Sequence, residues 1–284
     1  MLLAANHPNS WLDGVILSTL FEENIYSLAR GDAFKKRWHA KFLKKIHQFP
    51  VYRTSEGVEN LEHNYTTFAA CQEVFASGGI VLIFSEGRCM NEWKLRPLKK
   101  GTARLAISTW QKKIKLTVMP VGLNYNQFRN FGKNVFINFG EPLNKGEILQ
   151  HQSDGKLLLS FNEQLEEQLK RLVYNIGKDD VEKQRKLLTV PSPLWKQVVL
   201  AVPALIGFLV HAPAYFAARG LTKKIFDNDH FDSAVASMVV LFYPFYLLLV
   251  FLIIHHYFNW KPALITILLM PFTAWAAVQL KKQY

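Results

Sequence analysis

The sequence has few cysteines and lacks the signature motifs of several enzyme classes. Its two cysteines, Cys71 and Cys89, cannot build a disulfide framework and do not have metal-ligand spacing. We therefore expect two reduced thiols in a cytosol-facing domain. A Gly-x-Ser-x-Gly nucleophile elbow and a His-Glu-x-x-His metal pair are both absent. No hydrolase motif therefore supports the interpretation of this chain as a hydrolase.

We expect no signal peptide in the first residues of this sequence. The segment Met1–Ala5 is apolar, but it is too short and no basic residue precedes it. It is typical of the end of a strand that runs directly into a polar motif. A domain that begins on its own active-site strand is unusual, so we expect the natural protein to extend further upstream.

Apolar residues and positive charge are both abundant. Half of the 284 residues are hydrophobic, and the formal net charge is +12. Excess positive charge favours a polyanionic partner such as nucleic acid, anionic lipid or a phosphorylated substrate. The hydrophobic residues are concentrated near the C-terminus, which helps to choose between these partners.

Residues 1–190 show alternating strand and helix patterns. Continuous apolar runs typical of buried strands occur at 80–84, 116–123 and 135–139, and helical patterns at 58–76, 101–111 and 156–176. This alternation predicts an α/β fold with a mostly parallel sheet flanked by helices. We expect residues 1–190 to form the catalytic domain.

The composition changes after the break at Val190–Pro193, and residues 191–284 form a hydrophobic membrane region. Three uncharged segments follow, at about 198–218, 234–254 and 262–280. Each has about the 20 residues that a helix needs to cross the bilayer hydrocarbon. We therefore expect an integral membrane protein with C-terminal transmembrane helices and a catalytic domain that faces the cytoplasm.

The first of these segments is a poor candidate for a straight span. It contains Pro203, Gly207 and Pro213, and proline removes helical hydrogen bonds. Three spans would also place Lys223 outside, against the positive-inside tendency. Our hypothesis is that 198–218 is re-entrant or interfacial. The second and third segments would then form a hairpin, with Lys261 the only basic residue outside.

The stretch from Asn6 to Asp13 carries the clearest chemical signal. His7 and Asp13 follow an apolar strand and precede a helix-compatible segment, so they can converge across one strand-to-helix turn. An imidazole held by a carboxylate is a usable general base. The alternative is a structural histidine beside an N-capping aspartate.

Asn-His-Pro-Asn-Ser followed by Asp resembles the first motif of the glycerolipid acyltransferase family, with five residues between His7 and Asp13 where the usual form has four. The resemblance implies transfer of a fatty acyl group from acyl-CoA or acyl carrier protein to a hydroxyl of a phosphorylated glycerol or lysophospholipid. His7 would be the base and Asp13 would orient it. No metal or organic cofactor is implied.

Two further segments resemble later motifs of that family. Phe49–Arg53 is similar to the second, which implies that Arg53 contacts the acceptor phosphate. Phe84–Arg88 resembles the third, usually Phe-Pro-Glu-Gly-Thr-Arg, and implies that Glu86, with Gly87, binds the acceptor hydroxyl. Here Ser85 replaces the proline, and Arg88 and Cys89 stand where the threonine and the arginine would be. The resemblance therefore implies that Arg88 binds the acceptor phosphate only if the loop reaches the same point by another path.

The remaining motifs complete the resemblance over about residues 1–145. Lys100 and Gly101 begin a predicted helix and could hold an anion through charge and backbone amides together. A solvated lysine pair is the alternative. The segment 118–122 resembles the fourth motif, a strand interrupted by proline, which would wall the site.

The basic and aromatic stretch at 34–47 is compatible with several roles. Six Lys or Arg residues alternate there with apolar residues at near-helical spacing. Such a helix can lie in an anionic lipid interface, grip nucleic acid, or simply pack on the sheet with a solvated face. The membrane segments favour lipid, so we expect anionic membrane lipid as a partner and no nucleic acid.

Two other functions stay open from the sequence. A membrane hydrolase would use His7 and Asp13 to activate water, and would turn over thioester without an acceptor. A non-catalytic scaffold would bind anionic lipid through the basic stretch, and would tolerate replacement of His7.

Overall fold

The computed structural model describes residues 1–52, 62–150 and 153–281, which form two compact units. The first unit comprises Met1–Asn124 and Phe136–Lys178, and the second comprises Tyr125–Val135 and Asp179–Tyr284. The motifs belong to the first unit and the apolar helices to the second. Arg53, the predicted phosphate contact, lies outside the described residues.

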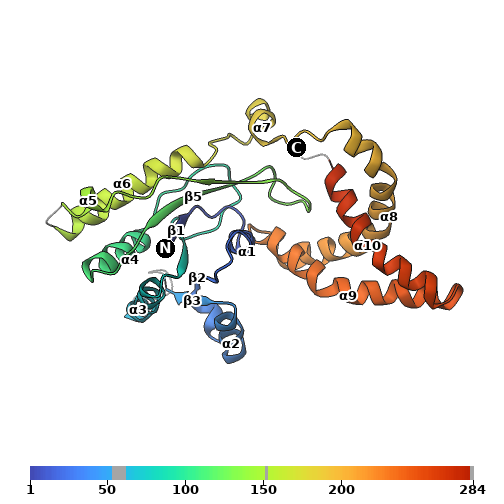
Figure 1. Ribbon diagram of the computed structural model, residues 1–284, viewed down its shortest axis with the longest axis horizontal. Coiled ribbons are helices and arrows are strands. Elements are labelled where there is room, and N and C mark those ends of the chain that lie inside the picture. The colour runs from blue at the N-terminus through green and yellow to red at the C-terminus, as the bar shows by residue number, and fades with distance from the viewer. Residues whose placement is uncertain (53–61, 151–152, 282–284) are drawn as a thin grey trace. The chain divides into compact units, whose positions relative to one another are not determined.

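A six-stranded sheet organises the first unit (Figure 1). Its strand order is β3-β2-β4-β1-β5-β6, and β1 pairs in parallel with β4 and β5, as does β2 with β3 and β4. The strands are β1 (Leu2–Ala5), β2 (Ile25–Arg30), β3 (Gln48–Val51), β4 (Ile80–Phe84), β5 (Val118–Tyr125) and β6 (Val135–Phe139). The predicted α/β fold with a mostly parallel sheet is therefore confirmed.

The innermost strands determine where a site can form. All four residues of β1 are 0% exposed, as expected of a parallel strand that is covered on both faces. His7 follows β1 and Glu86 follows β4, and these two strands are parallel neighbours. Their carboxyl ends therefore meet at one edge of the sheet, where parallel α/β folds bind their ligands.

Helices supply the rest of the first unit's core. They are α1 (Trp11–Ser18), the 3₁₀ helix η1 (Gly31–Phe34), α2 (Arg37–Lys45), α3 (His63–Ala76), α4 (Lys100–Gln111), α5 (Lys145–Ile148) and α6 (Asp154–Leu172). The side chains that α6 buries are four residues apart and form one apolar stripe: Leu157, Phe161, Leu165 and Leu169. At Gly122 of β5, an added Cβ would lie 2.6 Å from the Leu172 carbonyl oxygen, so glycine permits this close approach of α6.

The second unit contains the long apolar helices. After α7 (Val181–Leu188) come α8 (Leu194–Ile225), α9 (Phe231–Tyr257) and α10 (Trp260–Leu280). Each of the last three is long and apolar enough to cross a membrane by length and composition. The three predicted apolar segments therefore lie inside three helices, and α8 begins directly after the predicted break.

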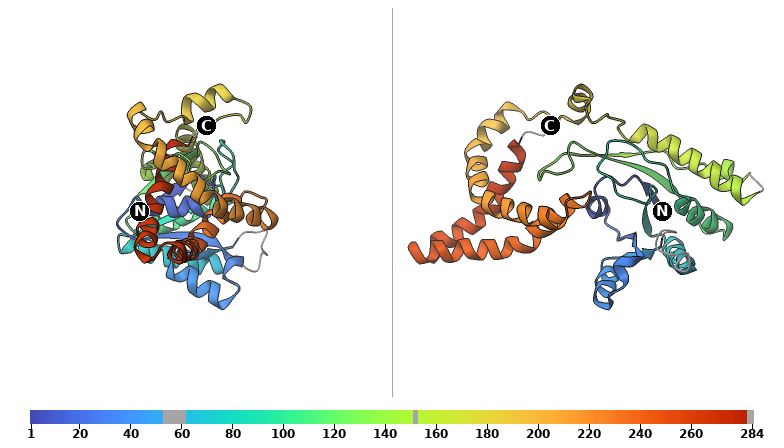
Figure 2. Two further views of the ribbon diagram at one scale, coloured as in Figure 1. Left: turned by 90° about the vertical axis from the view of Figure 1, so that its right-hand side faces the viewer. Right: turned by 180° about the vertical axis from the view of Figure 1, so that it is seen from behind.

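Helix α8 bends back on itself (Figures 1 and 2). Lys196, in its first turn, donates to Gln279 near the end of α10, and Lys281 just beyond donates to the Phe131 carbonyl. Arg219, near the other end of α8, donates to the Arg129 carbonyl at 2.7 Å. A straight helix would separate Lys196 from Arg219 by about 35 Å. Both ends of α8 therefore lie near the loop 125–135.

The bend has identifiable causes in the sequence. Pro203 and Pro213 lie inside α8 and remove backbone donors. Side chains contact backbone carbonyls around the bend, since His211 Nδ1 lies 2.8 Å from the Gly207 carbonyl oxygen and the Tyr246 hydroxyl donates to Val210. At Gly207, an added Cβ would lie 1.9 Å from the Thr273 carbonyl oxygen, so glycine lets α8 and α10 touch through their backbones.

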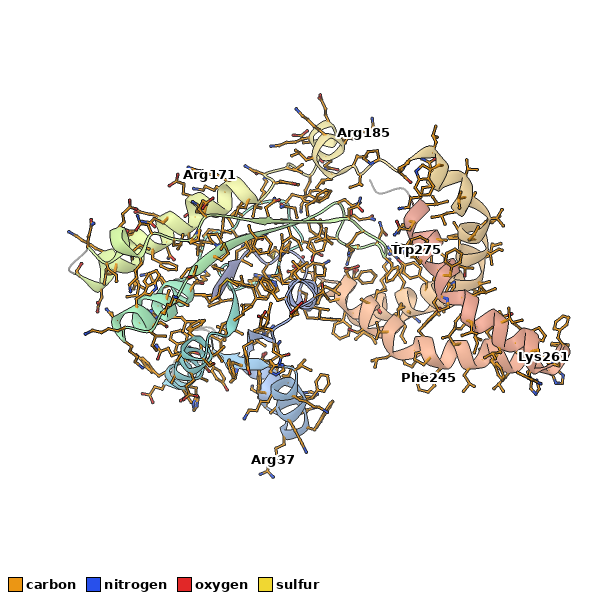
Figure 3. The ribbon with its side chains drawn as sticks, in the orientation of Figure 1. Arg37, Arg171, Arg185, Phe245, Lys261 and Trp275 are labelled. Atoms are coloured by element: carbon orange, nitrogen blue, oxygen red, sulfur yellow. The ribbon has the colours of Figure 1, made fainter. Side chains whose placement is uncertain are left out.

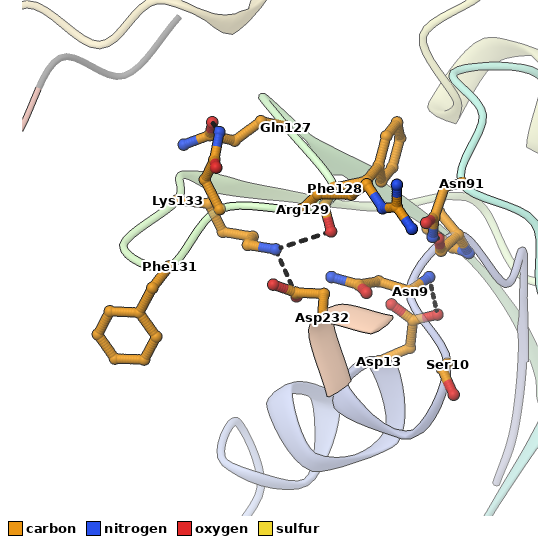
Figure 4. Close-up of polar contacts among 12 residues, drawn as sticks. Asn9, Ser10, Asp13, Asn91, Gln127, Phe128, Arg129, Phe131, Lys133 and Asp232 are labelled. Carbon is orange, nitrogen blue, oxygen red and sulfur yellow. Dashed lines mark hydrogen bonds and ion pairs between the residues drawn. The ribbon is translucent and has the colours of Figure 1, made fainter. Parts of the chain in front are cut away.

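Helices α9 and α10 form a hairpin whose open end holds the loop 125–135. Lys133 of the loop pairs with Asp232 in the first turn of α9, and both side chains are largely buried (Figure 4). Lys281, which follows α10, binds the Phe131 carbonyl of the same loop. The turn at the far end carries Lys261, which is exposed (Figure 3). The end of the hairpin that holds the loop 125–135 thus carries several charged residues, whereas the far end carries a single lysine.

Candidate active site

His7 and Asp13 are in direct contact. His7 Nδ1 lies 2.8 Å from Asp13 Oδ2. The same oxygen accepts the Asn9 N–H at 2.8 Å, as Figure 4 shows. Asp13 is 0% exposed, whereas the His7 side chain keeps 16% of its surface exposed. If Nδ1–H donates to the carboxylate, Nε2 carries the lone pair. No other described residue bonds Nε2, so this nitrogen is available to a substrate.

The imidazole is also held by contacts that do not involve Asp13. Its ring stacks on Phe84, the last residue of β4, with centroids 3.9 Å apart and planes 11° from parallel. The preceding residue, Asn6, bridges to β5 by donating to the Leu123 carbonyl at 2.9 Å and accepting the Leu123 N–H at 2.7 Å. The end of β1 is therefore fixed to both neighbouring strands, which limits the movement of His7.

The loop after β4 forms three further hydrogen bonds with the backbone of the His7 motif. The Met90 N–H donates to the His7 carbonyl at 3.1 Å, and Asn91 Nδ2 donates to the Pro8 carbonyl at 2.8 Å. The Ser10 N–H donates to Cys89 Sγ at 3.0 Å. Ser10 has a φ of 54°, an uncommon backbone conformation for a residue other than glycine. The turn that carries His7 is thus held in place by the residues that directly follow the third motif.

Glu86 is the main anchor between the two motifs. Its Oε2 accepts the His7 N–H at 2.9 Å and its Oε1 accepts the Arg96 N–H at 2.8 Å. Burial raises the pKa of Glu86 above its ordinary value. The two hydrogen bonds and the nearby charges of His7 and Arg96 lower this pKa, but by less than burial raises it. Glu86 therefore positions His7, and a second lone pair on each oxygen leaves the predicted hydroxyl contact chemically available.

This pKa direction predicts a pH-dependent stability. Folded Glu86 holds its proton more tightly than unfolded Glu86, so its contribution is full below the ordinary glutamate pKa and is lost as pH rises through the raised pKa. Glu86→Gln should remove this slope from the melting temperature measured in detergent across that pH window. Glu73→Gln, on the exposed face of α3, is the matched control and should keep it. Parallel profiles for wild type and Glu86→Gln would contradict the assignment.

The segment Ser85–Gly87 also positions the start of α4. Ser85, at the proline position of the motif, accepts the Lys99 N–H through its carbonyl at 2.8 Å and bonds Thr102 through its hydroxyl at 3.0 Å. Gly87 has a φ of 66°, which favours glycine. The N-terminal end of α4 is therefore fixed to the end of β4, at the same edge of the sheet as His7.

Arg88, Lys100 and Gly101 lie at this edge without direct bonds to His7 or Asp13. Arg88 and Lys100 are exposed, and nothing lies within 4 Å of a Cβ added to Gly101. The first turn of α4 is thus open for an anion to approach its backbone amides. Near Arg53, the preceding residue Tyr52 is held by Asn64, which accepts its N–H at 2.8 Å and donates to its carbonyl at 2.9 Å.

Sequence reasoning gave Asn6 and Phe84 no role of their own, although both lie in the predicted motifs, and it did not identify Asn91. Their contacts to the His7 turn join positions far apart in the chain, so no local pattern signals them. Within residues 1–52, 62–150 and 153–281, no three His, Cys, Asp or Glu side chains come together as metal ligands would.

Comparisons with known proteins identify the same region. Residues 1–124, which contain every motif discussed above, match the family model described as Acyltransferase. The 1-acyl-sn-glycerol-3-phosphate acyltransferase of Bacillus subtilis (strain 168) is 28% identical over 178 residues, which cover 60% of this chain and 80% of that protein. The first 124 residues are therefore similar to acyltransferases, and part of the chain is similar to a glycerolipid acyltransferase.

Proposed function

We propose that this protein transfers a fatty acyl group from a thioester donor to the hydroxyl of a glycerol-phosphate-type acceptor in phospholipid synthesis. The observation that carries the proposal is the His7–Asp13 contact, with Nε2 free of described partners, at the carboxyl end of β1. The match to the Acyltransferase family and the name of the Bacillus subtilis relative support the reaction and the acceptor class.

In the proposed reaction, His7 acts as general base on the acceptor. Nε2 removes the hydroxyl proton while the acceptor oxygen attacks the thioester carbonyl carbon. Asp13 keeps the proton on Nδ1 and stabilises the imidazolium that forms. When the tetrahedral intermediate collapses, the carbon–sulfur bond breaks and the imidazolium returns its proton to the thiolate. The proposed reaction needs no metal or organic cofactor, because it requires neither a redox step nor a Lewis acid.

The acceptor would be held at the same edge of the sheet. Arg53, Arg88 and Lys100 are the proposed phosphate contacts, with the open backbone of Gly101 at the start of α4. Glu86, beside Gly87, is the proposed contact for the glycerol hydroxyl in addition to its anchoring role. Holding both reactants in place contributes much of the rate, since a general base alone typically supplies about 10²- to 10⁴-fold.

The direct test is an acyl-transfer assay on membranes that contain the full chain. Labelled acyl-CoA or acyl carrier protein is offered with glycerol 3-phosphate, lysophosphatidate or other lysophospholipids. Labelled product should form with one phosphorylated acceptor, and thioester consumption should depend on that acceptor. Thioester cleavage at the same rate without any acceptor would instead indicate a hydrolase.

The second unit supports a membrane location with a defined orientation. The end of the α9–α10 hairpin that holds the loop 125–135 carries Arg219, Lys223 and Lys281, whereas the far turn carries Lys261. Positive charge favours the cytoplasmic side. Because the loop is continuous in the chain with β5 and β6, we propose a cytoplasmic catalytic unit, with α8 re-entrant and α9 and α10 spanning. Anionic membrane lipid is the proposed partner of the basic surfaces.

Cysteine labelling in intact cells tests this topology. Both native cysteines are buried, and burial raises the pKa of Cys71 to about 12, so they should stay unreactive. A membrane-impermeant maleimide added outside should label Lys261→Cys, and should label Lys223→Cys only after permeabilisation. Both lysines are exposed, which makes them a matched pair. Labelling of Lys223→Cys from outside would overturn the re-entrant arrangement.

A further inference from the structure

Helix α2 presents an apolar stripe to solvent. None of its residues is buried, and its inward face has only partly buried side chains such as Ala40 and Leu43. On the other side Trp38, Phe42 and Ile46 are 68%, 59% and 45% exposed. These three residues are four positions apart and so share one face. An exposed tryptophan and phenylalanine on one short helix need a partner surface to cover them.

Every charged residue of this helix is basic. Its cations, with those of the preceding turn, are Lys35, Lys36, Arg37, Lys41, Lys44 and Lys45. No Asp or Glu occurs from residue 33 to residue 48. Among the described residues no carboxylate pairs with any of the six, and Figure 3 shows Arg37 pointing away from the sheet. Exposed surface pairs elsewhere in this unit, such as Lys170 with Glu166, show that the chain neutralises other lysines.

We propose that α2 docks the catalytic unit on an anionic lipid surface, with Trp38, Phe42 and Ile46 at the boundary between headgroups and acyl chains. The lysines beside this stripe would bind lipid phosphates, because an interfacial helix combines an apolar face with basic flanks. Aromatic rings suit this boundary since they have a large apolar surface and tolerate a polar rim.

The membrane helices make a bilayer the favoured occupant. A unit joined to membrane-spanning helices meets lipid at a high effective concentration, so a modest affinity is sufficient. Nucleic acid matches the charge but leaves the apolar stripe uncovered unless its bases are unpaired. The proposal rests on the membrane location and not on acyl transfer. It assigns to α2 the task of holding the active site near substrates that reside in lipid.

The test uses the full chain in lipid nanodiscs. Trp38→Cys is labelled with an environment-sensitive nitrobenzoxadiazole, while Cys71 and Cys89 are buried. Discs of phosphatidylcholine, alone or with phosphatidylglycerol, carry a nitroxide on the lipid chains as quencher. We expect quenching and a blue shift in the anionic discs, and a weaker response in neutral discs or at high salt.

A matched pair of double variants identifies the source of the effect. In the labelled protein, Lys41→Gln with Lys44→Gln should lower the equilibrium constant for docking by about 30-fold, as expected for two lysines near an anionic surface. Lys170→Gln with Arg171→Gln removes the same charge from α6 and should change nothing. Neither pair is buried, so the melting temperature in detergent should stay constant.

Three results would overturn the proposal. The label could remain unquenched in all discs, or be quenched equally in neutral and anionic discs. The label could also respond to a single-stranded oligonucleotide and not to lipid, which would assign α2 to nucleic acid. The readout needs no substrate, so its failure is separate from any failure of acyl transfer.

Discussion

Replacing His7 by alanine should reduce kcat for acyl transfer by about 10²- to 10⁴-fold, the range expected when a general base is removed. The variant lacks His7 Nε2, the atom proposed to take the proton of the acceptor hydroxyl. The KM for the acceptor should change little, because the proposed phosphate contacts lie on other segments. The measurement is a steady-state assay with labelled thioester and saturating acceptor, on wild type and variant at equal membrane content.

Two controls separate lost chemistry from lost structure. His63→Ala removes an exposed histidine of α3 and should leave kcat unchanged. His7→Gln retains a polar side chain and the backbone N–H that Glu86 accepts, yet supplies no base, so it should be as inactive as the alanine variant. Wild-type activity in His7→Ala would eliminate the proposed mechanism and favour the scaffold function.

The parts of the fold that local pattern could predict are those with one dominant signal. The apolar run at 80–84 is β4 of a parallel sheet, and the uncharged segments after residue 190 are helices. The contact of His7 with Asp13 follows from their spacing, because a strand-to-helix turn brings both side chains to one point. The prolines of α8 predict a departure from a straight helix, because each removes a backbone donor.

The parts that could not be predicted depend on contacts between distant segments. Cys89 gives no sign in the sequence that its sulfur accepts the Ser10 N–H, nor Asn91 that it holds Pro8. The loop 125–135 is another example, since it lies between two strands in the sequence but belongs with the apolar helices through Lys133 and Lys281. Local pattern carries no information on such pairings.

The role of Glu86 shows how the structure extends a motif-based expectation. The resemblance implies a contact with the acceptor hydroxyl, whereas the structure shows both carboxylate oxygens bound to backbone amides of His7 and Arg96. Through its carboxylate, Glu86 therefore holds the backbone of His7 in place. The motif has a carboxylate after β4, and the parallel pairing of β4 with β1 brings it to His7.

Replacing Asp13 by asparagine should also lower kcat strongly, by about 10²- to 10⁴-fold, although it changes a single atom. Asp13 Oδ2 accepts from both His7 Nδ1 and the Asn9 N–H, so it orients the ring and the turn together. An asparagine amide that donates to Nδ1 would move the ring proton to Nε2, and the base would be lost; the equivalent change in a serine protease triad costs about 10⁴ in kcat. Nitrogen-15 resonances of the imidazole would report the tautomer directly.

The matched control for this variant is Asp32→Asn, which removes a carboxylate of the same unit that pairs with Arg30 at the surface. It should leave kcat and the His7 tautomer unchanged. The double variant His7→Ala with Asp13→Asn gives the strongest test, because groups that act as one unit are not additive. If Asp13 works only through His7, the double variant should be no less active than His7→Ala alone. A further multiplicative loss would show that Asp13 acts on the substrate by a separate route.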